Sequence, residues 1–298
     1  MELKPMKAPS ESVVDLASLR YPAFLSPKID GMRALGKSSR LLSSSLSAFP
    51  NDHLNRMMSD FGLHGIDGEI VVGEPYGQDV LRRTMSGITS QQGEPDFMLY
   101  AFDMWDSPAG FRDRQVALQE RIHNLTHRAR SRVRVVPQVL VELPGEAAQL
   151  EDTWLEMGFE GAMYRSPDGR YKFGRCTWRE ANVLKIKRFE DAEAVLVGLD
   201  EAMANGNGLA PSGRRSTHRA GLLGKGELGM LHAMDLRTGA AIRVGPGRLT
   251  KTERVAIFRD PDRFMKRIFT YKHFPHGRHE AARHPTFKCW RDPIDLSA

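Results

Sequence analysis

The sequence predicts an α+β chain of two units, of which the second is built mainly from strands. Three observations lead to this prediction. Strand-like and helix-like segments alternate over residues 1–189, and the pattern of the sequence changes after Phe189. Beyond that point, Gly, Pro and basic residues recur every few positions. A chain of 298 residues is long enough for two domains of ordinary size. We therefore expect one domain over residues 1–189 and a second over residues 190–298.

Strands of the first unit are predicted where β-branched and aromatic residues run together between Gly, Pro or Asp. Such runs occupy residues 68–73, 97–105 and 133–141. Within residues 112–130, Leu118, Ile122 and Leu125 recur at helical spacing on a charged background. This spacing predicts an amphipathic helix that packs on a sheet.

The second unit is predicted to be a small all-β domain. Residues 194–199 and 229–236 have the apolar runs of strands. Residues 205–226 are rich in Gly, Ser and Arg and have little apolar periodicity, which is typical of a mobile basic loop.

Composition and charge exclude several classes of protein. The 43 Lys and Arg residues against 37 Asp and Glu residues give a net charge of +6, and hydrophobic residues make up 41% of the chain. These values exclude wholesale disorder and a fibrous repeat. The positive charge is compatible with nucleic-acid binding but does not establish it, because many enzymes of this size have a similar charge.

The two cysteines, Cys176 and Cys289, are too few for a disulfide framework or a Cys-rich zinc site. No stretch approaches the roughly 18 consecutive apolar residues of a membrane span. The start of the chain lacks the apolar core of a secretory signal. We therefore expect a cytoplasmic protein that does not bind a membrane.

A lysine after a short apolar run is the first candidate for chemistry. Lys28 follows Ala23, Phe24 and Leu25 by a few positions and precedes Asp30-Gly31. A lysine amine is a nucleophile only when neutral, so its ordinary pKa of about 10.4 must be lowered by cationic neighbours or by desolvation. Taken alone, the segment is also typical of a surface turn.

Four further segments follow Lys28–Arg33 in a particular order. They are Asp67-Gly68-Glu69, Phe102-Asp103, Glu160-Gly161 and Lys185-Ile186-Lys187. The five segments together resemble motifs I, III, IIIa, IV and V of the covalent nucleotidyltransferase superfamily, which comprises DNA ligases, RNA ligases and mRNA capping enzymes. The resemblance covers nearly the whole chain.

The last third of the chain favours one branch of this superfamily. Arg283-His284-Pro285-Thr286-Phe287, followed by Arg291, resembles the element that ends the OB domain of ATP-dependent DNA ligases. Residues 215–218 resemble a segment of small bacteriophage-type ligases at the start of that domain. The resemblance implies a nucleotidyltransferase domain with ATP-grasp-like antiparallel sheets over residues 1–189. It also implies a β-barrel OB-fold domain that binds DNA over residues 190–298.

The resemblance further implies an ATP- and Mg²⁺-dependent DNA ligase that seals nicks in double-stranded DNA through lysyl-AMP and DNA-adenylate intermediates. We expect it to act as a monomer in the cytoplasm of a bacterial cell or a phage-infected host. Lys28 would form the adduct, while Lys185 and Lys187, with Mg²⁺, would lower its pKa and stabilise the phosphate oxygens. Arg291 would act on the departing pyrophosphate.

The remaining expected roles also come from the resemblance. Phe102 would stack on adenine, Arg33 would lie near the ribose, and Lys172 and Arg175 look like the basic stretch between motifs IV and V. The full set of expected cofactor-binding residues is Pro27, Lys28, Ile29, Arg33, Glu69, Phe102, Lys185 and Lys187. The expected metal ligands are Glu69 and Glu160, and the expected DNA-binding residues are Arg214, Arg215, His218, Arg219, Arg283 and Lys288.

Two positions depart from the family pattern. Ser26 stands where many members carry an acidic residue that recognises the adenine amino group. Residues 43–46 lack the Ser-Arg of motif Ia, which leaves Arg40 as the nearest arginine. Two alternatives stay open: an RNA ligase or guanylyltransferase of the same superfamily, and a non-catalytic nucleic-acid-binding protein that kept the fold.

Overall fold

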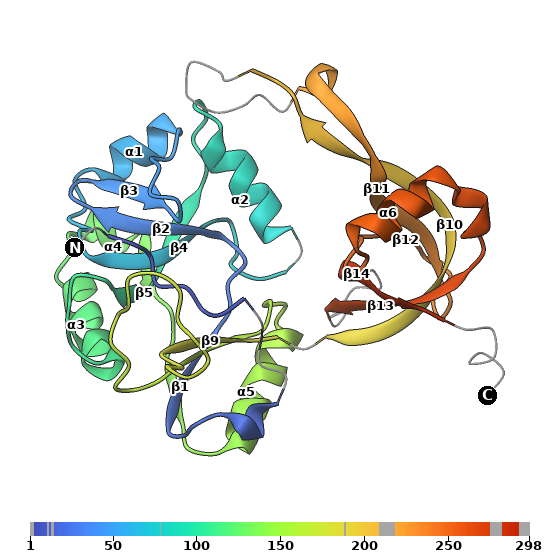
Figure 1. Cartoon of the computed structure of the whole chain (residues 1–298). Helices are drawn as coiled ribbons and strands as arrows, with labels where there is room; N and C mark the ends of the chain where they lie inside the picture. Colours follow the sequence, from blue (N-terminus) through green and yellow to red (C-terminus); the bar gives the residue numbers. More distant parts are fainter. Residues whose placement is uncertain are drawn as a thin grey trace. The chain divides into compact units, whose positions relative to one another are not determined.

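The computed structural model describes residues 3–10, 12, 15–77, 79–187, 189–208, 218–274 and 282–291. The chain divides into two compact units, which are Met1–Arg188 and Phe189–Ala298 (Figure 1). Within the described ranges, no helix is both long enough and apolar enough to cross a membrane.

The smaller sheet of the first unit has four strands in the order β7-β1-β8-β9, and all neighbours are antiparallel. Its strands are β1 (Ala23–Pro27), β7 (Val139–Val141), β8 (Ala162–Arg165) and β9 (Val183–Ile186). Helix α5 (Pro144–Glu156) packs against β1 and β7, and its Trp154 and Ala147 are buried (Figure 1). These contacts hold one face of the sheet against α5.

The larger sheet of the first unit has five strands in the order β3-β2-β4-β5-β6. Its strands are β2 (Met32–Lys37), β3 (Arg40–Ser43), β4 (Ile66–Val72), β5 (Phe97–Met104) and β6 (Val133–Val135). The pairing of β5 with β6 is parallel, so the expectation of antiparallel sheets holds for every other pair of this unit but fails there.

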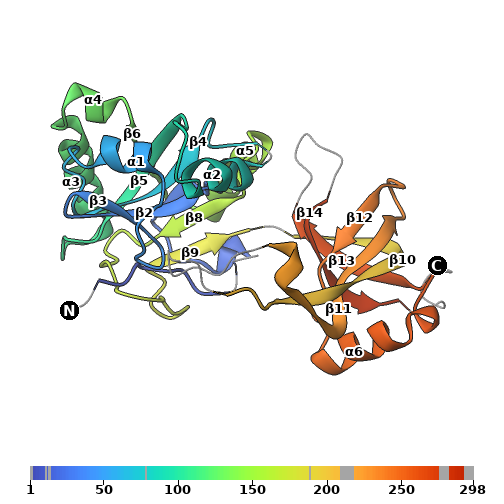
Figure 2. The same ribbon diagram turned by 90° about the horizontal axis from the view of Figure 1, so that it is seen from above.

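Four helices pack on this larger sheet (Figure 2). They are α1 (Asp52–Met58), α2 (Val80–Thr89), α3 (Phe111–His123) and α4 (His127–Arg130). Alternate residues of β5 belong to different cores: Leu99 and Ala101 pack with the helices, whereas Tyr100 and Phe102 pack with the smaller sheet. The period of two along a strand thus buries both faces of β5 and places Phe102 between the two sheets.

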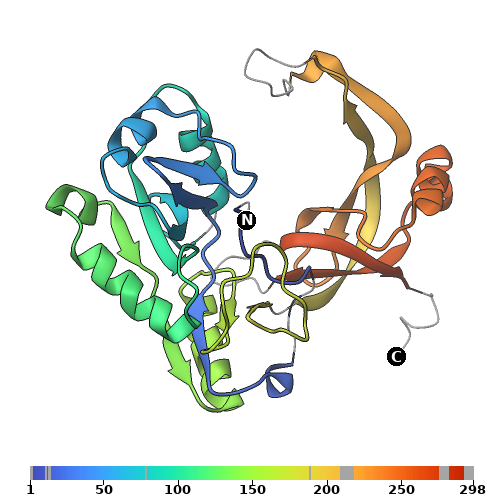
Figure 3. The same cartoon turned by 60° about the vertical axis from the view of Figure 1, so that its left-hand side comes forward.

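The second unit is an antiparallel five-stranded sheet in the order β12-β11-β10-β13-β14. Its strands are β10 (Glu190–Asn205), β11 (Leu222–Asp235), β12 (Ala241–Val244), β13 (Ile268–Phe274) and β14 (Arg283–Trp290). The long strands β10 and β11 run side by side as a hairpin (Figure 3). In the described residues no closed barrel forms, although a single parallel bridge between Gly245 and Thr286 links the two edges of the sheet.

The second unit also contains a helix that the sequence analysis did not anticipate. Helix α6 (Lys251–Arg259) packs on β11 and buries Ile257. It begins at a capping box in which the Thr250 hydroxyl accepts a hydrogen bond from the Glu253 amide, while the Glu253 carboxylate accepts one from the Thr250 amide. The prediction of an all-β unit was therefore wrong at this segment. Short 3₁₀ helices within the described residues are Leu16–Ser18, Arg219–Gly221 and Pro261–Arg263.

Three predicted segments are divided differently in the structure. The run 133–141 forms two strands in different sheets, because Pro137 has no amide hydrogen with which to continue a ladder. The helix predicted over 112–130 is broken before Thr126, whose side chain caps α4. Strand β11 already begins at Leu222, inside the predicted loop 205–226; residues 209–217 of that loop lie outside the described residues.

Candidate active site

Three charged side chains come together where neighbouring strands of the smaller sheet end. Pro27 of β1 pairs with Ala162 of β8, which in turn pairs with Ile186 of β9. Lys28 follows the first of these residues and Lys187 follows the last, while Glu160 lies two positions before Ala162. The register therefore brings residues from three distant parts of the sequence to one edge of the sheet.

The backbone fixes Lys28 against Glu160. The Lys28 amide donates a hydrogen bond to the Gly161 carbonyl oxygen at 2.9 Å, and the Glu160 amide donates one to the Lys28 carbonyl oxygen at 3.2 Å. Gly161 has a φ of 142°, and a Cβ atom there would lie 2.4 Å from the Ile186 carbonyl oxygen. Glycine is therefore required at this crossing for both its conformation and its size.

Glu160 bridges two lysines. The ammonium groups of Lys28 and Lys187 donate to different oxygens of the Glu160 carboxylate. Burial raises the pKa of Glu160, but the charges of the two lysines outweigh burial, and the net pKa is lowered. The carboxylate is therefore ionised at neutral pH and holds both ammonium groups.

The expected lowering of the Lys28 pKa by Lys185 and Lys187 is not found in the ligand-free protein. Burial lowers the pKa of Lys28, but the charge and hydrogen bond of Glu160 raise it by more, so the net pKa lies above its ordinary value. Burial lowers the pKa of Lys185 and of Lys187, and repulsion from neighbouring lysines lowers both further. The expectation failed for Lys28 because it treated Glu160 only as a metal ligand.

A pocket of about 280 Å³ lies beside this cluster, between the two sheets of the first unit. It contains every expected cofactor-binding residue except Lys187. Its lining consists of Met6, Lys7, Ala8, Ser26, Pro27, Lys28, Ile29, Arg33, Glu69, Phe102, Val136, Met163, Arg165, Arg175, Val183 and Lys185.

Sequence reasoning missed Met163 and Arg165, two pocket residues that the strand period could have identified. Ser26, Met163 and Lys185 occupy one register row across β1, β8 and β9, and all three line the pocket. Arg165 lies two positions beyond Met163 on the same strand and also lines it. Once Glu160-Gly161 is taken as the start of a strand, alternation predicts that Met163 and Arg165 share a face.

The opposite wall of the pocket contains Arg33 and Glu69, and the buried Asp67 holds Arg33 in place. The Arg33 guanidinium binds both oxygens of Asp67, which is fully buried, and its Nε–Oδ1 distance is 2.8 Å. Glu69 pairs with Arg33 in the strand register and lines the pocket. Burial raises the pKa of Glu69 to about 8, although the charges of Lys28 and Arg33 oppose that rise.

Gly31 allows β4 to approach the turn after Lys28. A Cβ atom at Gly31 would lie 2.5 Å from the Ile70 carbonyl oxygen and 2.8 Å from Cγ of Glu69. The small residue of the Asp30-Gly31 pair thus makes room for the strand that carries Glu69. This requirement explains why a glycine follows the lysine at this spacing.

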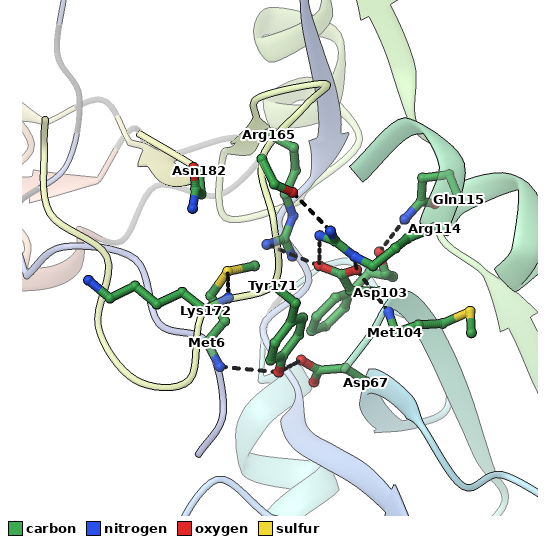
Figure 4. Close-up of polar contacts among 12 residues, drawn as sticks. Met6, Asp67, Asp103, Met104, Arg114, Gln115, Arg165, Tyr171, Lys172 and Asn182 are labelled. Atoms are coloured by element: carbon green, nitrogen blue, oxygen red, sulfur yellow. Dashed lines mark hydrogen bonds and ion pairs between the residues drawn. The ribbon is translucent and has the colours of Figure 1, made fainter. Parts of the chain in front are cut away.

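A second buried ion pair, between Arg114 and Asp103, lies next to Arg165, which lines the pocket (Figure 4). Arg114 donates from Nε to Asp103 at 2.7 Å, and Arg165 Nη1 lies 3.7 Å from the same carboxylate. The guanidinium carbons of Arg165 and Arg33 each lie 5.4 Å from the centre of the Phe102 ring. Cationic groups therefore hold the ring that was expected to stack on adenine.

Lys172 pairs with Glu180 in the first unit, whereas the remaining expected catalytic and DNA-binding residues belong to the second unit. Arg291 pairs with Glu193 at 2.7 Å, and Lys288 pairs with Asp191. The His218 side chain accepts a hydrogen bond from the Ala220 amide and caps the short helix that contains Arg219. Arg214 and Arg215 lie outside the described residues, and of Arg283 only the backbone, in β14, is described.

Two carboxylates could bind a metal ion here: Glu69 lines the pocket, and Glu160 lies beside it, bound to Lys28. The described part of the chain contains no group of three or more His, Cys, Asp or Glu side chains arranged to hold a metal. Mg²⁺ is usually bound through one or two carboxylates, with the remaining ligands supplied by waters and substrate phosphates. The donor set therefore fits an ion that arrives with a nucleotide rather than one held by the protein alone.

A family model and several solved structures match this chain. A family model described as ATP dependent DNA ligase domain matches residues 5–187. No curated protein sequence matches the chain. A crystal structure of Chlorella virus DNA ligase-adenylate is 25% identical, with a TM-score of 0.56, and the alignment covers 97% of this chain and 98% of that chain.

Two further solved structures share the fold at lower identity. A structure from a study of Lig E DNA ligases is 22% identical, with a TM-score of 0.68, and covers 97% of this chain and 98% of its own. The ligase domain of LigD from M. tuberculosis is 19% identical, with a TM-score of 0.50, and covers 97% of this chain and 95% of its own.

Proposed function

The chain belongs to the family of ATP-dependent DNA ligases, and on that basis we propose how its residues divide the work of nick sealing. Enzymes of this family use ATP and Mg²⁺ to seal nicks in duplex DNA. In our proposal, Nζ of Lys28 attacks the α-phosphorus of ATP, so that an N–P bond forms and the bond to pyrophosphate breaks. AMP then passes to the 5′-phosphate of the nick, and the 3′-hydroxyl displaces it.

The bridge from Lys28 through Glu160 to Lys187 is the single observation on which this assignment rests. It joins a nucleophile, a carboxylate and a second cation at the wall of a pocket large enough for a nucleotide base and sugar. Lys28 must lose a proton before it attacks, and its ion pair with Glu160 opposes that loss. Burial favours it, so the amine becomes reactive once the charge of Glu160 is engaged elsewhere.

Glu160 and Glu69 are the proposed Mg²⁺ ligands. When bound, Mg²⁺ supplies positive charge that neutralises carboxylate and phosphate oxygens. Glu69 has a pKa of about 8, so it must release its proton before it can act as a ligand. Lys185 and Lys187 provide the fixed positive charge that stabilises the phosphate oxygens as pyrophosphate departs.

The nucleotide itself is proposed to bind between the two sheets. Phe102 offers an aromatic face to adenine, and Met163 lines the same pocket from the smaller sheet. Pro27 and Ile29 complete the apolar wall beside Lys28. Arg33 is oriented by Asp67 and is suited to contact ribose oxygens. Ser26 brings a hydroxyl to the position where many family members carry an acidic residue.

We propose that the second unit is an OB fold that binds nicked duplex DNA as part of a monomeric, cytoplasmic enzyme. Support comes from its five-stranded antiparallel sheet and from the bridge between Gly245 and Thr286, which links the edges that a barrel would join. The proposed phosphate contacts are Arg214, Arg215, His218, Arg219, Arg283 and Lys288. Contacts of this kind make binding independent of sequence and sensitive to salt.

Labelling with α-labelled ATP tests the assignment. The wild type should form one enzyme-AMP adduct on Lys28, Lys28→Ala should form none, and the control Lys37→Ala, at an exposed strand end, should label normally. ATP should label the enzyme and GTP should not, and all-DNA nicks should be sealed in preference to all-RNA nicks.

Each alternative predicts a different result. An adduct on another lysine would contradict the role of Lys28. Labelling by GTP would indicate a guanylyltransferase, sealing of RNA nicks alone would indicate an RNA ligase, and no labelling of the wild type would indicate a non-catalytic binding protein.

A further inference from the structure

One wall of the nucleotide pocket comes from a segment far from every motif. Met6, Lys7 and Ala8, here called the strap, line the pocket together with Arg33 and Arg175. Met6 is only 2% exposed. We propose that Tyr171 is a positioning residue that fastens the strap to Arg33 and so fixes this wall for nucleotide binding. The inference rests on the proposed function in that it takes the pocket to be the ATP site.

The Tyr171 hydroxyl joins three elements at one point (Figure 4). It accepts a hydrogen bond from the Met6 amide at 3.1 Å and donates one to the buried Asp67 carboxylate at 2.6 Å. Nη2 of Arg33 lies 3.4 Å from the Tyr171 hydroxyl oxygen. Burial and the charge of Asp67 both raise the pKa of Tyr171, so the hydroxyl keeps the proton that this arrangement requires.

Arg33 also binds the strap directly, through the carbonyl group of Met6. Its Nη1 donates to the Met6 carbonyl oxygen at 2.6 Å, while its remaining nitrogens bind Asp67. The amide and the carbonyl of Met6 are therefore both bound to the cluster formed by Tyr171, Asp67 and Arg33. A change in the position of the strap must change the partners of the arginine proposed to contact the ribose.

The strap is also paired with the loop that contains Tyr171. The Lys7 amide donates to the Gly174 carbonyl oxygen at 2.8 Å, and the Lys7 carbonyl oxygen accepts from the Cys176 amide at 2.7 Å. Arg175 donates from Nη1 to the Ala8 carbonyl oxygen at 2.7 Å. This pairing keeps the strap beside the loop and limits how far it can move. The hydroxyl of Tyr171 therefore determines where the strap lies relative to Arg33, and not whether the strap lies at the pocket.

Loss of the hydroxyl leaves the Met6 amide without its partner and Asp67 with one donor fewer. Tyr171→Phe should therefore let Arg33 and Met6 shift while the ring keeps its packing. We expect the KM for ATP in the adenylylation step to rise about five- to tenfold, the size of effect that follows when one buried hydrogen bond is lost. The kcat of that step should change less than twofold, because Lys28 and Glu160 are not touched.

Tyr164→Phe is the matched control. Its hydroxyl donates to the Arg20 carbonyl oxygen at 2.8 Å, within the same unit, and it is not among the residues that line the pocket. A merely structural role for Tyr171 would make the two variants lose similar stability and show the same KM. A positioning role requires that only Tyr171→Phe raises KM.

Hydrogen exchange of the ligand-free protein gives a readout that does not depend on activity. In Tyr171→Phe the amide of Met6 should exchange at least tenfold faster than in the wild type, and in Tyr164→Phe it should not. Unchanged exchange at Met6, or a KM that rises equally in both variants, would overturn the proposal. A wild type that binds no ATP would instead contradict the proposed function, while the exchange result would still decide whether Tyr171 fastens the strap.

Discussion

At the scale of single residues, the site is governed by how buried charges are compensated. Glu160 is ionised because the charges of two ammonium groups outweigh the effect of its burial. At Glu69 the charges of Lys28 and Arg33 do not outweigh burial, and the carboxyl group keeps its proton. Two carboxylates in one site thus differ in protonation at neutral pH because their neighbours differ. Arg33 and Asp67 form a bidentate pair that orients the arginine toward the pocket.

The raised pKa of Glu69 makes the stability of the ligand-free protein depend on pH. Its pKa is about 8 in the folded protein and 4.5 in the absence of burial, so the folded state binds the proton more tightly. The contribution of this proton to the free energy of unfolding is fully present below about pH 4.5 and is lost as the pH rises through 8. Between about pH 4.5 and 8 the free energy of unfolding should fall by up to about 1.4 kcal/mol per pH unit.

Thermal unfolding of Glu69→Gln measured at pH 5.5 and 8.5 checks this prediction. The variant should lose less stability than the wild type over that interval, because glutamine does not ionise. Glu180→Gln is the control: the pKa of Glu180 is lowered to about 2, so it stays ionised throughout the interval. An identical pH dependence in wild type and Glu69→Gln would show that Glu69 is already ionised at neutral pH.

At the scale of secondary structure, the ends of three strands and one glycine assemble the reactive cluster. The antiparallel pairing of β1 with β8 and of β8 with β9 aligns Lys28, Glu160 and Lys187. Gly161 lets the chain enter β8 beside the carbonyl of Ile186. The same strands place Met163 and Lys185 on the pocket face, so one register positions both the nucleophile and the base-binding wall.

Gly161→Ala should disrupt this junction. Its φ of 142° is unfavourable for alanine, and the added Cβ would meet the Ile186 carbonyl oxygen at 2.4 Å. We expect a loss of at least about 1–3 kcal/mol of stability from backbone strain. We also expect adenylylation to fall by more than tenfold, because Glu160 must shift.

Gly93→Ala provides the control for Gly161→Ala. Gly93 also has a positive φ, of 96°, but a Cβ atom there would have no neighbour within 4 Å. This control variant should therefore introduce backbone strain without a steric clash of the added Cβ atom. Chemical denaturation and α-labelled ATP together measure both effects, and equal adenylylation in the two variants would contradict the importance of the β8–β9 contact.

At the scale of the whole molecule, two compact units hold different parts of the proposed pathway. The first unit contains the pocket and the lysine cluster. The second contains Arg291, which pairs with Glu193 on β10. In ligases of this family, adenylylation and nick sealing are separate steps, so a residue of the second unit can serve one of them and not the other.

Arg291→Ala should separate the two steps. If Arg291 acts on the departing pyrophosphate, the variant should form at least tenfold less enzyme-AMP from ATP and should seal a nick that already carries 5′-AMP at nearly the wild-type rate. Arg243→Ala is the control, since Arg243 is an exposed arginine of the same unit that pairs with Asp200. Equal losses in both steps would show that Arg291 supports the second unit in general.

The sequence by itself determined the family, because five short segments occur in the order and spacing of one superfamily. It also pointed to seven of the residues that line the pocket. Each of the five segments contains residues that the nucleotidyl-transfer reaction requires. The segments could therefore be identified from the sequence without coordinates. Runs of β-branched and aromatic residues were enough to find β4 and β5, since strands that are buried on both faces have continuous apolar runs.

Only the tertiary structure decided how these residues act on one another. The pKa of Lys28 depends on Glu160, which is distant in sequence and reaches it through the pairing of β1 with β8. The division of residues 133–141 between two sheets, the helix α6 and the wall formed by Met6, Lys7 and Ala8 likewise depend on long-range packing. Local sequence sets which groups are present, but burial and charge compensation arise between elements, and those contacts exist only in the folded chain.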